Sequence, residues 1–488
     1  MINARRVAPS RPPGGEREVA FSLVDEALHL LDANTSPCSI QLEARVAGRL
    51  DEARLRRALG AALDVHPMAR ARRMASNRWL TRDRWAFPRT RPDVLRVVDC
   101  LDDEQLAAAR AELQSMPSPL TVALPLRAWL ARHPDGDVLM LNIHHAAMDG
   151  FGAVRVLRSV ARAYAGIPDP EPTIDFQEAR RLPAQLLKAD GPTRLRRAVV
   201  LAERLGDLVR PPARIASDGG IAQAGYGFQT RALSNAQTEA LVAAEHGGTV
   251  NDLLLSALHL SIAAWNAEHG TPCRRITVLV PANLRPAAWR EDVAGNFALP
   301  IRVSTGPRTR RSRRAALAAI TEQTSRKKRT GMGGALLELL RHTDALPLWF
   351  KAAMVKLLPL TGNRLVDTSM FSNLGLLGEP LDFGYDAGEA AEVWFSPPAR
   401  MPLGVSVGAV TTAGRLHLVF RHRHSQCSEA AAHRFAERYL AELDHLGSAL
   451  SPQRRSRRAD GYGLGLPPPV APAYRPFGRR SVGPRPAA

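Results

Sequence analysis

The sequence predicts an α/β protein built from two halves, and three observations support this fold class. At 488 residues the chain exceeds one ordinary hydrophobic core, so two units of roughly 200 residues each are expected. Segments that alternate like strands are interleaved with segments whose apolar residues recur at helical spacing. No internal repeat at a solenoid period is visible. We therefore expect an N-terminal half over 19–170, a connecting segment over 171–215 and a C-terminal half over 216–450.

Periodicity and turn signals predict the elements of the N-terminal half. In chain order they are a helix over 19–33, a strand over 39–48, a helix over 50–67 closed by Pro67, a helix over 102–114, two strands within 124–145 joined by a Pro-Asp-Gly-Asp turn, and a helix over 151–166.

The connecting segment is rich in Pro, Arg and Leu and lacks the alternation of strands. The same signals then predict the elements of the C-terminal half. They are a strand over 227–234, a helix over 235–246, a helix over 249–267 that starts from the cap-like Thr249, a strand over 274–285, a helix over 308–329 loaded with Arg and Lys, a strand over 414–424 and a helix over 428–446.

Composition limits the classes of function. The formal charge of +19 suggests nucleic acid, but the last 38 residues alone hold eight arginines against one acid. Both this basic tail (451–488) and the N-terminal tail (1–18) are expected to be disordered, so nucleic-acid binding is not favoured. No run approaches the roughly 18 apolar residues of a membrane helix, and the N-terminus lacks the apolar region of a signal peptide. Four cysteines without CxxC spacing argue against a zinc site or a disulfide framework. A cytoplasmic location is expected.

The stretch "LNIHHAAMDGFG" (141–152) is the strongest candidate for a functional site. Neighbouring strand residues point to opposite faces, so the side chains of His144 and His145 should diverge. Two diverging histidines are poorly placed to bind one metal ion, and no metal ligand is assigned here. Neutral imidazole accepts a proton near neutral pH, which suits a general base. A purely structural role for both histidines, at the end of a strand, remains equally open from the pattern alone.

The segment "HHAAMDG" (144–150) resembles the HHxxxDG signature of the condensation-domain and CoA-dependent acyltransferase superfamily. This superfamily includes peptide-synthetase condensation domains, polyketide-associated acyltransferases, wax ester synthase/diacylglycerol acyltransferases and chloramphenicol acetyltransferase. Further blocks of the superfamily occur in order over about 19–447. They are the helix and His-Pro turn of 50–72, the strand before the motif, "TVND" (249–252), "VPANLRP" (280–286) with "GNFA" (295–298), and "FSNLG" (371–375).

The resemblance implies a V-shaped pair of chloramphenicol-acetyltransferase-like α/β halves with a central tunnel. It implies that His145 is the general base for a hydroxyl or amine acceptor, which attacks an acyl thioester of CoA or an acyl carrier protein directly. No permanently bound cofactor and no Ser or Cys nucleophile is then needed. The resemblance also makes Asp149 the second catalytic-motif residue, paired with an arginine for which Arg285 is the candidate. His144 and Gly150 would support the motif, Gly150 by allowing a tight turn.

The tetrahedral intermediate of acyl transfer needs hydrogen-bond donors aimed at its oxyanion. Asn296 in "GNFA" and Ser372 and Asn373 in "SNLG" are the candidates, although all three could equally cap loops. Two stretches that combine basic and apolar residues, 194–210 and 346–360, suggest a lipid-like acceptor and peripheral membrane contact; packing in a core is the alternative. An O-acyltransferase related to the stand-alone members is favoured, but the "PLSPxD" opening of wax synthases is replaced here by "AFSLVDEAL".

Two other functions remain open. The spacing of His144 and Asp149 matches the His-x4-Asp pattern of glycerolipid acyltransferases, although no phosphate-binding blocks of that class are found. A non-catalytic condensation-like protein that binds a carrier protein or an acyl ligand is the alternative from a different class.

Overall fold

The protein is described here by a computed structural model. The described residues are 17–450, without 33–36, 75–76, 91, 171–173, 175, 182–190, 219–223, 245–246, 287–288, 290–291, 330–337, 339 and 400–402. Both expected tails, apart from residues 17–18, lie outside this range. The α-helices are α1 (Leu23–Leu31), α2 (Glu52–Val65), α3 (Asp103–Ser115), α4 (Gly150–Ala165), α5 (Phe176–Ala179), α7 (Gly191–Gly206), α8 (Asn235–Ala243), α9 (Val250–Glu268), α10 (Arg313–Arg329), α12 (Leu348–Lys356) and α13 (Glu429–Leu450). Short 3₁₀ helices are η1 (Pro67–Arg70), η3 (Thr309–Arg311) and η4 (Leu358–Thr361).

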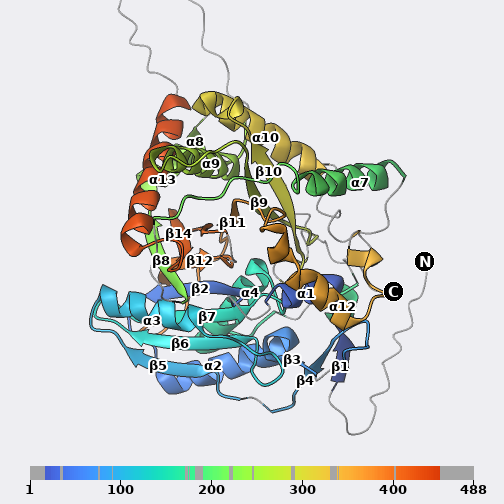
Figure 1. The fold of residues 1–488 in the computed structure, drawn as a ribbon. Helices are drawn as coiled ribbons and strands as arrows, with labels where there is room; N and C mark the ends of the chain where they lie inside the picture. The colour runs from blue at the N-terminus through green and yellow to red at the C-terminus, as the bar shows by residue number, and fades with distance from the viewer. Residues whose placement is uncertain are drawn as a thin grey trace, which may run out of the picture. The chain divides into compact units, whose positions relative to one another are not determined.

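The sheet of the N-terminal half has five strands in the order β12-β2-β7-β6-β5, drawn in blue and cyan apart from β12 (Figure 1). The strands are β2 (Ser39–Val46), β5 (Leu95–Asp99), β6 (Leu126–Arg132), β7 (Val138–His144) and β12 (Ala390–Ser396). All pairs are antiparallel except β5 with β6. The expected pair of strands within 124–145 is confirmed as β6 and β7, and β7 is buried along its whole length.

The sheet of the C-terminal half has six strands in the order β10-β9-β11-β13-β14-β8. The strands are β8 (Tyr226–Ala232), β9 (Ile276–Asn283), β10 (Ala298–Thr305), β11 (Ser369–Leu376), β13 (Val405–Thr412) and β14 (Arg415–Arg423). Helices α9 and α13 pack together over this sheet, and their apolar side chains form a second core. The two α/β halves expected from the sequence are therefore present.

Strand β12 lies between β11 and β13 in the sequence, yet it joins the sheet of the N-terminal half. It pairs antiparallel with β2, from Ala390 opposite Val46 to Ser396 opposite Gln41. Its Phe395 consequently belongs to the core of the N-terminal half. The chain thus leaves the sheet of the C-terminal half after β11, adds one strand beside β2 and returns at β13, so β12 ties the two halves together.

Two helices differ from the expected ranges. The segment 19–33 does not begin as a helix, because residues Arg17–Ala20 form strand β1, which pairs with β4 (Arg84–Phe87) in a small sheet with β3 (Arg72–Arg73). A capping box between Ser22 and Asp25 starts α1 at Leu23. The expected helix over 308–329 is interrupted at Ser312, which is extended and separates η3 from α10.

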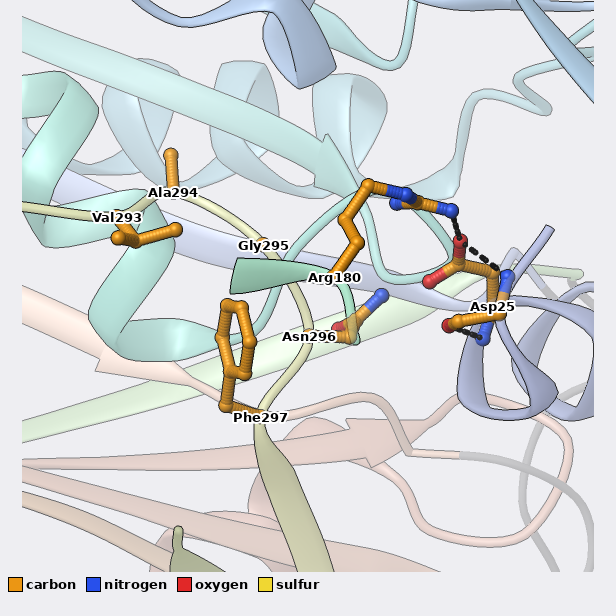
Figure 2. Close-up of a pocket in the computed structure, with 8 residues that line it drawn as sticks. Asp25, Arg180, Val293, Ala294, Gly295, Asn296 and Phe297 are labelled. Atoms are coloured by element: carbon orange, nitrogen blue, oxygen red, sulfur yellow. Dashed lines mark hydrogen bonds and ion pairs between the residues drawn. The ribbon is translucent and has the colours of Figure 1, made fainter. Parts of the chain in front are cut away.

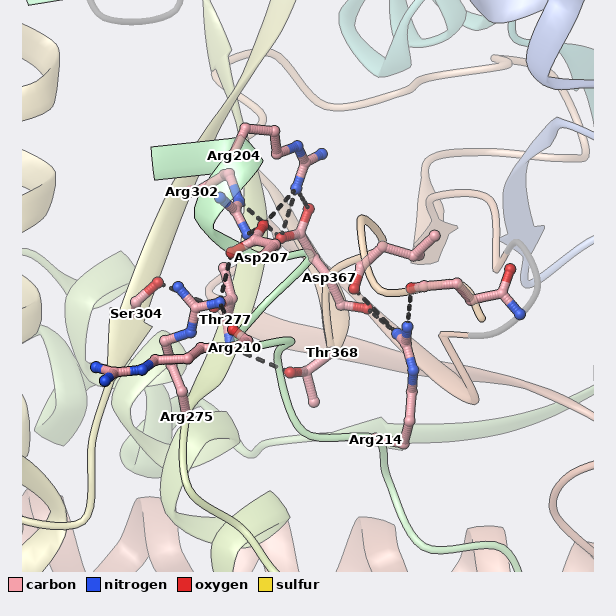
Figure 3. Close-up of polar contacts among 12 residues, drawn as sticks. Arg204, Asp207, Arg210, Arg214, Arg275, Thr277, Arg302, Ser304, Asp367 and Thr368 are labelled. Carbon is pink, nitrogen blue, oxygen red and sulfur yellow. Dashed lines mark hydrogen bonds and ion pairs between the residues drawn. The ribbon is translucent and has the colours of Figure 1, made fainter. Parts of the chain in front are cut away.

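The connecting segment carries α5 and α7, and its end is anchored to the C-terminal half by buried carboxylates (Figure 3). Asp207 and Asp367 are both fully enclosed, and Arg302 bridges them with hydrogen bonds of 2.6 and 2.7 Å. Arg204 at the end of α7 adds two bonds of 3.0 Å to Asp367. Buried carboxylates are tolerated only when they are paired, so this network fixes the segment in place.

Candidate active site

The two histidines separate at the point where β7 ends. His144 is the last residue of the strand, in register with Ser39 of β2. His145 begins the following turn, and its backbone N–H donates to the carbonyl of Cys38 at 2.8 Å. His144 is buried, whereas the His145 side chain remains partly accessible.

Both ring nitrogens of His144 are occupied by protein. Its Nδ1 accepts the backbone N–H of Ala146 at 3.1 Å, so the proton sits on Nε2, which donates to Asp32 Oδ2 at 2.9 Å. The other oxygen of Asp32 accepts from the backbone N–H of Cys38 at 2.6 Å. Asp32 therefore fastens the end of α1 to the motif, and His144 holds the turn in place.

His145 has the opposite tautomer. Its Nδ1 lies 3.1 Å from the carbonyl oxygen of Met148, which can only accept, so Nδ1 carries the proton. Nε2 then presents a lone pair, and none of the described residues donates to it. Burial lowers the pKa of His145, and the nearby charge of Asp149 only partly opposes this. A neutral imidazole with an unoccupied Nε2 is the form that can accept a proton.

Asp149 is saturated by four hydrogen bonds at the start of α4. Arg285 donates to both carboxylate oxygens at 2.8 Å, and the backbone N–H groups of Gly152 and Phe297 donate at 2.9 and 2.8 Å. Burial would raise the pKa of Asp149, but the Arg285 charge and these bonds outweigh it, and the pKa is lowered. The pairing implied for Arg285 is present. Every oxygen of Asp149 is thus engaged, and Nδ1 of His145 bonds to Met148 rather than to Asp149.

Arg285 fixes the loop 293–297 of the C-terminal half against the motif. Besides Asp149, it donates to the carbonyl of Gly295 at 2.9 Å, and its guanidinium lies over the ring of Phe297, 4.6 Å from the centroid. The backbone N–H of Asp149 in turn donates to the Gly295 carbonyl at 3.1 Å. The Asp149–Arg285 ion pair therefore connects the two halves at the HHxxxDG motif, which includes His145.

Gly150 is required for a different reason than a tight turn. Its φ is not in the left-handed region, and it forms the ordinary first residue of α4. A Cβ at this position would lie 2.8 Å from Leu374 Cδ2 and 3.0 Å from Phe395 Cε2. A side chain there would require Leu374 of β11 and Phe395 of β12 to shift.

The three oxyanion candidates have different surroundings. Asn296 Nδ2 donates to the carbonyl of Ala146 at 2.8 Å, so this side chain contacts the motif turn, and its Oδ1 is buried without a partner among the described residues. Ser372 shares a strand face with Leu374, which packs on Gly150, and no described residue hydrogen-bonds to its hydroxyl. Asn373 instead closes a local turn, with Oδ1 accepting from Gly375 N at 2.8 Å.

A pocket beside the motif was not predicted from the sequence (Figure 2). It is lined by Ser22, Asp25, Arg180 and residues 293–297, the loop that Arg285 holds. Asp25 Oδ2 accepts from Arg180 at 2.7 Å, from Trp85 Nε1 at 3.0 Å and from the Ser22 backbone N–H at 3.0 Å. Asp25, Trp85 and Arg180 are far apart in sequence, and no local pattern joins them, just as none joins Asp32 to His144.

The chain shares its fold with the condensation domains of peptide synthetases. The first condensation domain of the calcium-dependent antibiotic synthetase, in complex with a substrate analogue, matches with a TM-score of 0.67 at 16% identity, covering 89% of this chain and 98% of that domain. The epimerization domain from the third module of tyrocidine synthetase B gives 0.63 at 18% identity, covering 91% and 99%. The SgcC5 protein from Streptomyces globisporus gives 0.61 at 18% identity, covering 88% and 99%. These likenesses show that the chain has a two-lobed condensation-domain fold.

In sequence, the chain is 36% identical over 428 residues to the "Uncharacterized protein Rv2305" of Mycobacterium tuberculosis (strain ATCC 25618 / H37Rv). The matched region covers 87% of this chain and 98% of the relative. The "Uncharacterized protein MT2362" of strain CDC 1551 / Oshkosh matches to the same extent. The chain belongs to the family of these mycobacterial proteins. No protein-family model matches it.

Proposed function

We propose that this protein is an acyltransferase that moves an acyl group from a thioester directly to a hydroxyl or amine, with His145 as general base. The observation that carries the proposal is the His145 tautomer: Nδ1 is fixed on the Met148 carbonyl and Nε2 is left to accept a proton. The condensation-domain fold supports a condensation-type reaction. An O-acyl transfer is favoured over N-acyl transfer, and CoA or an acyl carrier protein supplies the thioester.

The reaction follows from this geometry. As the acceptor oxygen attacks the thioester carbonyl, Nε2 of His145 takes the hydroxyl proton. The tetrahedral intermediate then collapses, the carbon–sulfur bond breaks, and the imidazolium returns the proton to the departing thiolate. Ser372 and Asn296 are the donors we place at the oxyanion. Each such donor typically stabilises the transition state by roughly 3–4 kcal/mol. No acyl-enzyme and no resident cofactor takes part.

The test is thiol release. Purified protein is offered acyl-CoAs of several chain lengths with long-chain alcohols, diacylglycerol and amines, and free thiol is measured for the wild type and His145→Ala. We expect acceptor-dependent release that falls about 10²- to 10⁴-fold in the variant. His445→Ala, an exposed histidine of α13, serves as the control and should retain full activity.

Acceptor-dependent release that is unaffected by His145→Ala would contradict the mechanism. If no acyl-CoA is used, the same panel is repeated with acyl groups carried on an acyl carrier protein. Absence of turnover with both donor types, together with binding of the acylated carrier, would instead favour the non-catalytic binding function.

A lipid-like acceptor and peripheral membrane contact are supported by the two basic and apolar stretches. On α12 and η4 the apolar residues Trp349, Phe350, Met354, Leu357 and Leu360 are exposed, and the chain brings Trp79 and Leu80 alongside them. On and just after α7 the exposed apolar residues are Leu195, Val199, Leu205, Leu208 and Val209. These side chains do not pack in a core. Among the described residues, no helix combines the length and apolar character needed to cross a bilayer.

A further inference from the structure

Two histidines at the end of β14 and one glutamate at the start of α13 form a compact cluster outside the HHxxxDG motif. Nε2 of His422 lies 3.2 Å from Oε1 of Glu429, and Nδ1 of His424 lies 3.7 Å from the same oxygen. One ligand atom from each residue can be chosen so that all lie within 4.8 Å of one another. His424 lies in the turn just after β14, and its ring centroid is 5.6 Å from that of His422. In Figure 1, α13 is the red helix that starts near β14 and β8.

The surrounding residues leave room for the cluster and orient it. Gly227 of β8 stands directly opposite His422, and a Cβ there would fall 2.3 Å from the His422 ring and 2.1 Å from Glu429 Oε1. Gln229 Nε2 donates to Oε2 of Glu429 at 2.9 Å. Oε1 is thereby turned toward both imidazoles, in the way that second-shell partners orient metal ligands.

The imidazole of His422 lacks the hydrogen bonds that a buried ring normally makes. Its side chain is fully buried, and neither Nδ1 nor Nε2 has a well-oriented hydrogen-bond partner among the described residues; Nδ1 of His424 has none either. Buried polar atoms of this kind call for an explanation, for which an ion is one of the standard answers.

We propose that His422, His424 and Glu429 bind one divalent transition-metal ion of the zinc class, with water completing the coordination. Tetrahedral zinc with bonds of about 2.0–2.1 Å places its ligand atoms roughly 3.3 Å apart, close to the 3.2 and 3.7 Å from Glu429 Oε1 to the two imidazoles. Two imidazoles and a carboxylate are ligands that suit zinc, cobalt and nickel. The nearest strand cations, Arg421 and Arg423, alternate to the other face of β14, where both lie over the ring of Tyr226.

The ion would clamp the first turn of α13 to the β8–β14 pair. It would also act close to the motif, because Arg421 donates to the carbonyl of Ser39 at 2.7 Å, and Ser39 is in register with His144. An ion that binds only the folded chain raises the free energy of unfolding. We therefore place the site as a structural clamp within the C-terminal half, between α13 and the β8–β14 pair.

Metal content and thermal unfolding test the proposal on untagged full-length protein stripped with a chelator. After addition of zinc and dialysis, about one zinc per chain should remain, with a raised Tm. Cobalt in its place should show the visible bands of tetrahedral coordination by nitrogen and oxygen, without thiolate charge transfer. Glu429→Gln and His424→Ala should weaken zinc binding at least tenfold and abolish the zinc-dependent rise in Tm.

His445→Ala, on the same helix and exposed, is the matched control and should bind like the wild type. Glu429→Gln retains the acceptor for Gln229, so its apo form should unfold at nearly the wild-type temperature, which separates loss of a ligand from loss of the fold. A wild type that retains no zinc would overturn the proposal. So would Glu429→Gln and His424→Ala variants that both bind zinc as tightly as His445→Ala.

Discussion

At the scale of single residues, one hydrogen bond to each Nδ1 gives the two motif histidines different chemistry. A backbone N–H donates to Nδ1 of His144, whereas a backbone carbonyl accepts from Nδ1 of His145. The first arrangement commits Nε2 of His144 to Asp32 as a donor, and the second leaves Nε2 of His145 as a base. The turn after β7 therefore selects which histidine can react.

The Asp149–Arg285 pair should matter more to stability than to proton transfer. Asp149→Ala leaves the Arg285 charge buried and unpaired, so we expect a loss of about 3–5 kcal/mol in the free energy of unfolding, measured by urea titration. Arg285→Ala should lose a similar amount, and the double variant clearly less than the sum.

Glu104→Ala, which removes an exposed carboxylate in α3, provides the control and should change stability by less than about 0.5 kcal/mol. Additive losses in the double variant would contradict a direct pair. So would an Asp149→Ala protein of wild-type stability.

At the scale of elements, the apolar surface of α12 should mediate membrane contact. Trp349 is 44% exposed and meets Trp79, which is 61% exposed, with ring centroids 6.0 Å apart. Amphipathic aromatic rings favour the bilayer interface. Trp349→Ser with Phe350→Ser should reduce cosedimentation with vesicles of mixed anionic and neutral phospholipids several-fold.

Leu101→Ser, which removes a more exposed apolar side chain, 73% open to solvent and outside α12, should leave vesicle binding unchanged. Equal binding by the double serine variant and the wild type would exclude α12 as the contact. A thiol-release assay on the same variants with water-soluble substrates should show no loss, because α12 holds none of the motif residues.

Elements with strong periodicity were predictable from the sequence, and their partners were not. Helices α2, α3, α4, α9 and α13 follow the expected ranges closely, because a buried stripe of apolar residues at helical spacing is a local signal. The transfer of β12 to the sheet of the N-terminal half was not anticipated, since strand pairing depends on residues about 350 positions away. Long-range pairing also explains why α1 starts later than expected, because residues 17–20 form a strand that pairs with β4.

The candidate site was likewise predicted only in part from the sequence. The motif and its resemblance placed His145, Asp149 and Arg285 together, and the ion pair is in the structure. Asp32 was missed because the bond that fixes the His144 tautomer spans 112 residues. Gly150 was expected for its turn, but the space around it is limited by Leu374 and Phe395 from other strands.

At the scale of the whole molecule, buried histidines should make the fold sensitive to mild acid. Burial lowers the pKa of His66 to about 3, of His259 to about 3 and of His417 to about 4. In the unfolded chain these groups titrate near pH 6.5. Below that pH the unfolded state binds more protons, so each histidine removes about 1.4 kcal/mol of stability per pH unit until its folded pKa is reached.

Urea unfolding between pH 7 and 5 measures this loss in a window above most carboxylate titration. The free energy of unfolding should fall steadily as the pH is lowered from 7 to 5. In His259→Gln the free energy of unfolding should change less per pH unit than in the wild type. A stability that stays constant or rises as the pH falls to 5 would show that these histidines are not held neutral in the fold.

The proposed reaction requires His145 to be a neutral base with its proton on Nδ1. Nitrogen NMR of histidine-labelled protein, with His145→Asn to identify the resonance, tests it without knowledge of the substrate. We predict at pH 7 a protonated Nδ1, an unprotonated Nε2 and a pKa below 6.5. A His145 ring that is charged at pH 7, or that carries its proton on Nε2, would contradict the account.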